Sequence, residues 1–257
     1  MEKLSVIILT KNEERNIERV VKSIKDIADE IIVVDSGSTD RTVEIAESLG
    51  AKVFYNRWVS FAVQRNFGES VASHKWILML DADEEVSEEL FQSIKRELGN
   101  PRYQAYEVPR RTYYLGKFLK YTWYPEWRLR LFKKGVLKYE GDLHEDVLFL
   151  EKISTGRLKG DLYHYSYRSL YHQYTKTVDY AKGMAKVYYK NGKKFRFYKL
   201  IFNPFFTFFK NYFLKFGFMD GWRGFLVAIS SFFYTFLKYI FLYELTLKDR
   251  FKDELWK

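Results

Sequence analysis

The feature that most constrains the fold is a regular alternation of apolar runs and helical patterns over the first hundred residues. The apolar runs predict β-strands at residues 4–9, 30–34, 52–55 and 75–80. The intervening and following segments predict helices at residues 13–27, 40–49, 61–72 and 87–98. Elements that alternate in this way form a parallel sheet with helices on both faces. The strands are continuous apolar runs, as expected when both faces are covered. The sequence therefore predicts an α/β fold.

Polar side chains follow three of these strands at the point where each strand ends. They are Thr10, Lys11, Asn12 and Glu13 after the first strand, Asp35 and Ser38 after the second, and Asp81 and Asp83 after the fourth. In open α/β sheets, ligands bind outside the carboxyl ends of the strands, so these side chains outline a candidate site. Neither a G-x-G-x-x-G pattern nor a Walker loop follows the first strand, which disfavours a dinucleotide or P-loop site.

The fourth strand ends in a closely spaced pair of carboxylates, Asp81-Ala82-Asp83. Like charges at this spacing repel one another unless a cation lies between them. Oxygen ligands of this kind suit Mg²⁺ or Mn²⁺ bridging a diphosphate, where the ion stabilises charge on a leaving group. An acidic surface turn is the alternative, but the position at the end of a buried strand favours a metal site.

Charge and aromatic residues are unevenly distributed along the 257 residues. Residues 1–180 hold 28 Lys/Arg and 28 Asp/Glu, whereas residues 181–257 hold 15 and 5, together with 25 of the 50 aromatic residues. We therefore predict two domains, residues 1–190 and a basic, aromatic, helical region at residues 191–257. Such a region suits an anionic surface, either a membrane or a nucleic acid.

The C-terminal region leaves three arrangements open. Lys210 and Lys215 lie within the aromatic segment 201–218, which favours a helix lying in a membrane interface. Residues 224–243 contain a single charge and are just long enough to span a bilayer. A helical pair packed inside a soluble core or a dimer interface is the third arrangement. The tail lacks clustered arginines and any zinc or RNA-binding pattern, so we expect no nucleic-acid partner.

Two further properties bound the function. The chain contains no cysteine, which excludes a disulfide framework and a cysteine nucleophile. The first apolar run is six residues long and meets charged residues directly, which is too short for the core of a signal peptide. We therefore expect the chain to begin with a strand of the fold.

Four segments carry a family resemblance: SVIILTKNEERNIERVVKSI, EIIVVDSGSTDRTVEIAESLGAKV, QRNFG and WILMLDADEEV. In this order and spacing, over residues 3–100, the chain resembles a family 2 glycosyltransferase of the GT-A fold. The later segments RLRLF, YEGDLHEDV, YHYSYRS and FMDGWRGF are similar to the subgroup that adds glucose to the lipopolysaccharide inner core. The resemblance implies an inverting, metal-dependent transfer of one hexose, glucose being favoured, from a UDP-sugar to a lipid-linked saccharide.

The resemblance also assigns roles to the strand-end residues. The loop 10–13 and Asp35 would hold the base and ribose, with Asp35 accepting a hydrogen bond from a uracil N–H and Ser38 nearby. Arg65 would approach the diphosphate or the sugar. Asp81 would face the ribose or the metal, and Asp83 would bind the metal directly. Helix or loop capping is the simpler alternative for Thr10, Ser38 and Asp35.

Transfer also requires a base that removes the proton of the acceptor hydroxyl. By resemblance the candidates are Glu145, which we favour, and Asp146, while His144 orients a carboxylate or an acceptor group, or is structural. His164 would complete the metal site, and Arg168 would meet a phosphate unless it is simply a surface residue. The segment WYPEWRLRLF departs from the QxxRW pattern of processive members, which predicts addition of a single sugar.

The implied location is the cytoplasmic face of the bacterial inner membrane, with the chain peripheral or monotopic. Three alternatives remain open: a non-catalytic scaffold that binds a nucleotide-sugar, transfer to another cell-envelope glycan, or transfer to a polyprenyl-linked acceptor. UDP is favoured over GDP or dTDP as the donor nucleotide.

Overall fold

The computed structural model describes residues 1–141 and 146–251. The chain forms two compact units. The first comprises residues 1–112 and 125–165, and the second comprises residues 113–124 and the chain from residue 166 onward. The predicted boundary at residue 190 coincides with the end of a helix inside the second unit.

The first unit contains the predicted parallel strands. They are β1 (Leu4–Thr10), β2 (Glu30–Asp35), β3 (Lys52–Tyr55) and β4 (Trp76–Asp81), in the spatial order β3-β2-β1-β4. Every residue of β1 is buried, in agreement with its continuous apolar sequence. The register sets Thr10 opposite Asp35 and Leu9 opposite Asp81. The carboxyl ends of the three strands therefore meet at one edge, as predicted.

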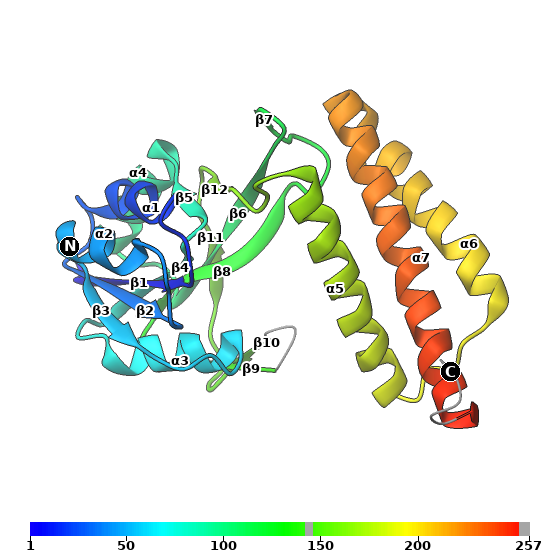
Figure 1. The fold of residues 1–257 in the computed structure, drawn as a ribbon. Coiled ribbons are helices and arrows are strands. Elements are labelled where there is room, and N and C mark those ends of the chain that lie inside the picture. The colour runs from blue at the N-terminus through cyan, green and yellow to red at the C-terminus, as the bar shows by residue number, and fades with distance from the viewer. Residues whose placement is uncertain (142–145, 252–257) are drawn as a thin grey trace. The chain divides into compact units, whose positions relative to one another are not determined.

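Helices cover both faces of these strands (Figure 1). The helices α1 (Ile17–Ile24), α2 (Thr42–Ser48) and α4 (Glu88–Gly99) pack on one face, and α3 (Phe61–Val71) packs on the other. Helix α3 approaches β1 so closely that a Cβ at Gly68 would lie 2.5 Å from Cγ2 of Ile7. Helix α1 is shorter than the predicted span 13–27 because residues 13–16 form a turn. In this turn the N–H of Asn16 donates a hydrogen bond to the carbonyl of Glu13.

Beyond β4 the sheet becomes mixed. Strand β8 (Glu126–Lys133) pairs antiparallel with β4, and the order continues through β6 (Ala105–Tyr114) and β12 (Leu162–His164) to β5 (Glu84–Val86). Strands β7 (Lys117–Phe118) and β11 (Thr155–Arg157) pair with β6, and β9 (Leu137–Glu140) pairs with β10 (Asp146–Phe149) in a separate ribbon. Strands β5, β7, β9, β10 and β11 escaped the sequence prediction because each has only two to four residues.

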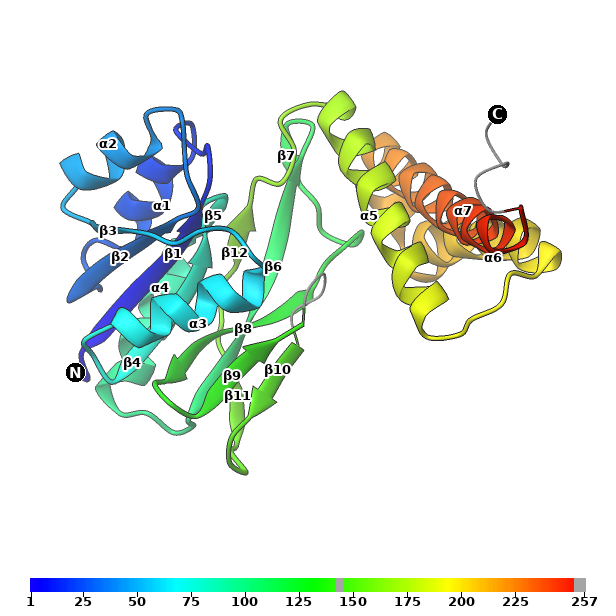
Figure 2. The ribbon, with the colours of Figure 1, turned by 60° about the horizontal axis from the view of Figure 1, so that its bottom comes forward.

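The second unit is built on three helices (Figure 2). They are α5 (Leu170–Lys190), α6 (Phe197–Phe209) and α7 (Trp222–Phe251), with a π-helical turn at Lys210–Leu214 and a 3₁₀ turn at Gly217–Asp220 before α7. Helix α7 contacts both others: Gln173 of α5 donates to Ser230 at 3.1 Å, and Asn203 of α6 donates to Tyr239 at 2.6 Å. The predicted α/β fold with a helical, apolar C-terminal region is therefore confirmed.

Within α7, the segment Trp222–Lys248 is long and apolar enough to cross a membrane by length and composition. A packed helix of a soluble protein can meet the same two criteria. The choice between crossing and packing therefore rests on what surrounds α7.

A buried carboxylate ties the amino-terminal ends of the parallel strands together. Glu30, at the start of β2, accepts hydrogen bonds from Ser5 Oγ at 2.7 Å, Lys52 Nζ at 2.8 Å, and both the N–H and the hydroxyl of Ser73 at 2.9 Å. Burial raises the pKa of this carboxyl, but the hydrogen bonds from Lys52, Ser73 and Ser5 outweigh it and lower the pKa from 4.5 to about 2.

We expect Glu30→Gln to make the free energy of unfolding less dependent on pH. Because the folded pKa is lowered, ionised Glu30 stabilises the fold above about pH 4.5, and this contribution disappears as pH falls toward about 2. The lost contribution is on the order of 3 kcal/mol at neutral pH. Urea unfolding at about pH 7 and about pH 3 measures it, because roughly half of the contribution is lost by the lower pH and the difference between wild type and variant should narrow accordingly. The control is Glu47→Gln, an exposed carboxylate on α2, which should leave the pH profile unchanged.

Candidate active site

The loops that follow β1 and β2 are joined by direct hydrogen bonds. The N–H of Asn12 donates to Ser38 Oγ, Asn12 Oδ1 accepts the N–H of Thr39, and the N–H of Glu13 donates to Thr42 Oγ1, each at 2.8 Å. Asn12 has a left-handed φ of 55°, which asparagine tolerates better than most residues. The structure thus brings together the two loops that were predicted to hold a nucleotide.

Asp35 organises the second of these loops. Its Oδ2 accepts the N–H groups of Gly37 at 2.8 Å and Ser38 at 2.9 Å, and its Oδ1 accepts the Ser38 hydroxyl at 2.5 Å. Loop capping, one of the two interpretations of Asp35 and Ser38, is therefore observed. A carboxylate accepts about four hydrogen bonds, so this role is compatible with one more from a bound base.

The first loop also carries the predicted side chains of Thr10, Lys11 and Glu13. The hydroxyl of Thr10 is buried and has no hydrogen-bond partner among residues 1–141 and 146–251. Lys11 is exposed, and the carboxylate of Glu13 accepts the side-chain amide of Asn16 at 2.7 Å. Thr10 therefore offers a buried hydroxyl at the edge where β1 ends.

Two buried arginines hold the first aspartate of the D-x-D pair. Arg65 Nη2 on α3 lies 2.8 Å from Asp81 Oδ1, and Arg130 Nη2 on β8 lies 2.8 Å from Asp81 Oδ2. The arginine side chains are only 1% and 3% exposed. Burial alone raises the pKa of the Asp81 carboxyl, but Arg65 and Arg130 outweigh it and hold that pKa well below its usual range. Asp81 is therefore an anion in the folded protein.

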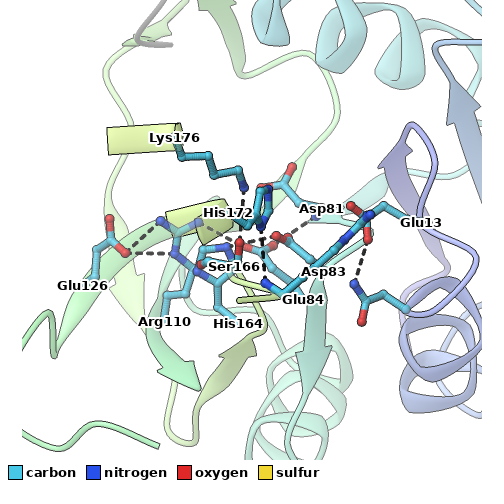
Figure 3. Close-up of polar contacts among 12 residues, drawn as sticks. Glu13, Asp81, Asp83, Glu84, Arg110, Glu126, His164, Ser166, His172 and Lys176 are labelled. Atoms are coloured by element: carbon cyan, nitrogen blue, oxygen red, sulfur yellow. Dashed lines mark hydrogen bonds and ion pairs between the residues drawn. The ribbon is translucent and has the colours of Figure 1, made fainter. Parts of the chain in front are cut away.

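Glu84 continues this chain of charges on the other side of Arg130. Its side chain is fully buried, and its Oε2 accepts the backbone N–H of Asp81 at 3.0 Å. Its Oε1 lies 2.6 Å from Arg130 Nη2 and 3.2 Å from Arg110 Nη1. Arg110 lies between Glu84 and Glu126, whose carboxylate is 2.8 Å from Arg110 Nη2 (Figure 3). Alternating charges thus fix the turn that carries the D-x-D pair.

The second aspartate lies next to the predicted histidine ligand. Asp83 Oδ2 is 3.4 Å from His164 Nε2 (Figure 3). The pairing of β5 with β12 sets this geometry, because His164 lies opposite Glu84 and the N–H of Tyr165 donates to the Asp83 carbonyl at 2.8 Å. Two predicted ligands from distant parts of the sequence are therefore neighbours.

A divalent ion fits this pair in part. Among the residues that the structure describes, no three His, Asp or Glu side chains are grouped closely enough to hold a metal together. Asp81, the third predicted ligand, is engaged by Arg65 and Arg130. Asp83 and His164 would hold an ion whose other ligands come from water and substrate phosphate, a common arrangement for Mg²⁺.

The remaining predicted residues lie elsewhere in the chain. Asp146 is exposed at the start of β10, opposite Glu140. Glu145 and His144 lie outside the described residues. Arg168 belongs to the second unit, where its backbone N–H donates to His172 Nδ1 at 3.2 Å.

Sequence reasoning missed Arg110, Arg130 and Glu84 as parts of this site. The signal was present in RLRLF, where arginines alternate with apolar residues in a strand. The alternation places Arg128 and Arg130 of this segment on one face of the strand. A charged residue on a buried strand requires a partner of opposite charge. The partner could not be identified because Arg130 and Asp81 lie 49 residues apart.

Comparisons with known proteins place the chain in a family. The sequence model of glycosyl transferase family 2 matches residues 5–148. An uncharacterised glycosyltransferase of Rickettsia typhi is 37% identical, over 97% of this chain and 90% of that protein. The lipopolysaccharide core biosynthesis glycosyltransferase LpsC of Rhizobium meliloti is 30% identical, over 94% of this chain and 92% of that protein. The chain belongs to glycosyl transferase family 2, as its motifs predicted, and is a transferase enzyme.

Among solved structures, similarity extends to glucosyl-3-phosphoglycerate synthase from Mycobacterium tuberculosis in complex with Mn²⁺, UDP and glucosyl-3-phosphoglycerate. The TM-score is 0.38 and the identity 25%, over 42% of this chain and 43% of that one. The family assignment rests on the sequence matches alone.

We expect Arg130→Met to destabilise the first unit strongly. The substitution keeps an unbranched apolar stem but removes the guanidinium, which leaves the buried carboxylates of Asp81 and Glu84 without their shared cation, a change that typically costs about 3–5 kcal/mol. Arg128→Met is the matched control, since Arg128 lies two positions away on β8 and is 42% exposed. Urea unfolding of both variants measures the difference, and equal losses would contradict the role given to Arg130.

Proposed function

We propose that this enzyme is an inverting, metal-dependent glycosyltransferase that moves one hexose, glucose being favoured, from a UDP-sugar to a lipid-linked saccharide such as the lipopolysaccharide core. The observation that carries the proposal is the position of the Asp83–His164 pair. Asp83 comes just after β4, whose carboxyl end lies at the same edge of the sheet as the joined loops of Asn12 and Asp35. That edge offers loops for a nucleotide and ligands for a diphosphate-bound ion.

The donor would lie along this edge. In the proposal, Thr10, Lys11, Asn12 and Glu13 line the nucleotide together with Asp35, whose carboxylate accepts a uracil N–H. Asp81, which is 20% exposed, would face the ribose or the metal, and the buried Arg65, 2.8 Å from Asp81, would act on the diphosphate through Asp81 rather than by direct contact. A divalent ion held by Asp83 and His164 would stabilise negative charge on the departing diphosphate. Arg168 is a candidate for a further phosphate contact.

The acceptor hydroxyl must lose a proton as it attacks the anomeric carbon opposite the diphosphate. Inversion follows from a single displacement of this kind, in which a carboxylate acts as the base. We assign this role to Glu145, with Asp146 as the alternative and His144 as the residue that orients it. Asp146 lies exposed at the start of β10, where an acceptor can reach it.

The acceptor and the location rest on two observations. LpsC carries lipopolysaccharide core biosynthesis in its name, and the match covers nearly the whole of both chains. The second unit exposes many apolar side chains beside basic residues, which supports attachment to an anionic membrane, here the cytoplasmic face of the inner membrane. Another cell-envelope glycan or a polyprenyl-linked saccharide would suit the same features.

The defining experiment is release of UDP, GDP or dTDP across a panel of nucleotide-sugars, with Mn²⁺, Mg²⁺ or EDTA and with membrane-lipid extract as the acceptor. The proposal expects metal-dependent release of UDP from one donor. Binding of UDP without release from any donor would favour the non-catalytic scaffold instead. Preference for GDP or dTDP would overturn the nucleotide assignment.

We expect Asp83→Asn and His164→Asn each to lower Mn²⁺-dependent UDP release by at least about 100-fold. Each substitution removes one of two protein ligands, and metal stabilisation of a leaving group contributes several kcal/mol to the rate. Asp26→Asn, which changes an exposed carboxylate just beyond α1, is the control and should retain full activity. Full activity of Asp83→Asn in the presence of Mn²⁺ would exclude the metal role.

A further inference from the structure

Helix α6 is apolar on two opposite faces, and among the described residues only one of these faces is covered by other side chains. On the inner face, Asn203 bonds to Tyr239 of α7 at 2.6 Å. The ring of Phe208 lies edge-on to Phe225, with centroids 5.9 Å apart. These contacts hold α6 against α7. A helix that is apolar all round is normally buried on every side, so the other face of α6 needs an occupant.

The uncovered face forms a stripe that we call the outer stripe. It consists of Ile201, Phe202, Phe205, Phe206 and Phe209 on α6 and Phe213 on the π-helical turn. One edge of the stripe adjoins α7, where the ring of Phe205 meets that of Phe232 with centroids 5.1 Å apart. The exposed fractions reach 68% for Phe202, 63% for Phe205 and 60% for Phe206. Exposed apolar residues continue through the following turn, at Leu214, Phe216, Phe218, Met219 and Trp222. A contiguous apolar surface of this kind marks an interaction site.

The charges around the outer stripe indicate what covers it. Residues 191–223 contain seven basic residues and one acidic residue. The basic residues are Lys193, Lys194, Arg196, Lys199, Lys210, Lys215 and Arg223. The acidic residue, Asp220, accepts the backbone N–H groups of residues 120–122. Aromatic rings flanked by lysines suit the headgroup region of anionic lipid, where each basic residue adds about 1 kcal/mol.

Length excludes a crossing by α6. The helix has 13 residues and the π-helical turn that continues it has 5, which together correspond to about 25 Å, whereas the hydrocarbon core of a bilayer is about 30 Å thick. An uncovered apolar face on so short a helix is better accommodated by a helix that lies along the membrane surface.

The neighbours of α7 argue against a crossing by that helix as well. Helix α5 runs beside it, with Gln173 bonded to Ser230 and the ring of Tyr174 next to Phe233. Farther along the same pair, Ala185 packs in one apolar cluster with Leu242. Helix α5 exposes four charged residues, Asp179, Lys182, Lys186 and Lys190. If α7 crossed a bilayer in this packing, it would draw these charges into hydrocarbon at about 3 kcal/mol each.

We propose that the outer stripe of α6, with the turn up to Trp222, lies in the headgroup region of an anionic membrane, and that α7 stays within the helical unit without crossing. The inference deepens the membrane attachment proposed above and rests on that part of the proposed function. It is independent of the donor and the acceptor. It locates the attachment on α6, although α7 is the helix whose length and composition suit a span.

The lack of cysteine makes a direct test simple. A single Phe206→Cys substitution in the full chain can carry an environment-sensitive fluorophore, and Lys186→Cys on α5 is the control. With vesicles containing about 30% phosphatidylglycerol, the label at 206 should shift to the blue and be quenched by lipid labels at headgroup depth. The label at 186 should keep its emission in water.

Three results would overturn the inference. If the emission wavelength of the label at 206 does not change when vesicles are added, contact of the outer stripe with lipid is excluded. If the label at 206 is already blue-shifted without lipid and the protein sediments as a dimer, the outer stripe is covered by a second copy of the chain. Quenching at 186 by lipid labels at the bilayer centre would show that the helical unit crosses.

We expect the double variant Phe202→Ser/Phe206→Ser to lower binding to these vesicles by at least about tenfold, because two large exposed rings are removed. The matched control, Tyr171→Ser/Tyr180→Ser, removes two exposed rings from α5 and should bind as the wild type does. Equal binding by both double variants would contradict the inference.

Measuring UDP release on the same samples separates the two proposals. Vesicle binding through α6 without UDP release would support the membrane inference and count against the transferase. UDP release without vesicle binding would support the transferase and count against the membrane inference.

Discussion

The first unit depends on a buried chain of alternating charges that crosses its sheet. Arg65 comes from α3, Asp81 from the end of β4, Arg130 from β8 and Glu84 from β5. These residues connect the parallel part of the sheet to the mixed part at the antiparallel pair of β4 and β8, and both arginines are almost fully buried. Buried charges are costly unless every partner is present, so each member constrains the positions of the others.

This constraint gives the two aspartates of one short turn different surroundings. Asp81 is held by two guanidinium groups, while Asp83, two residues later, faces His164. The two arginines therefore neutralise the charge of Asp81 and so reduce its repulsion with Asp83, which remains beside His164. A site that binds a charged donor benefits from this division, because its geometry is set before the ligand arrives.

The sequence predicted the parallel strands well because their apolar runs and the helices between them are local signals. The loops at Asn12 and Asp35 followed from strand order alone, and the structure joins them by direct hydrogen bonds. The strand β12 was predicted at residues 161–165, but β5 carries too few residues for a pattern, and it is the pairing of the two that sets His164 beside Asp83. Arg130 was recognisable as unusual in its strand, but its partners depend on contacts between distant residues that no local pattern encodes.

The second unit shows how packing changes the meaning of hydropathy. Composition alone selects α7 as the candidate for a membrane crossing, because its apolar run is the longer one. In the folded unit α7 bonds to α5 through Ser230 and to α6 through Tyr239, so part of its apolar surface already has partners. Helix α6 is shorter and carries more nearby charge, but its phenylalanines at 202, 205 and 206 face outward. Apolar surface left over after folding, rather than apolar sequence, is what a lipid surface can bind.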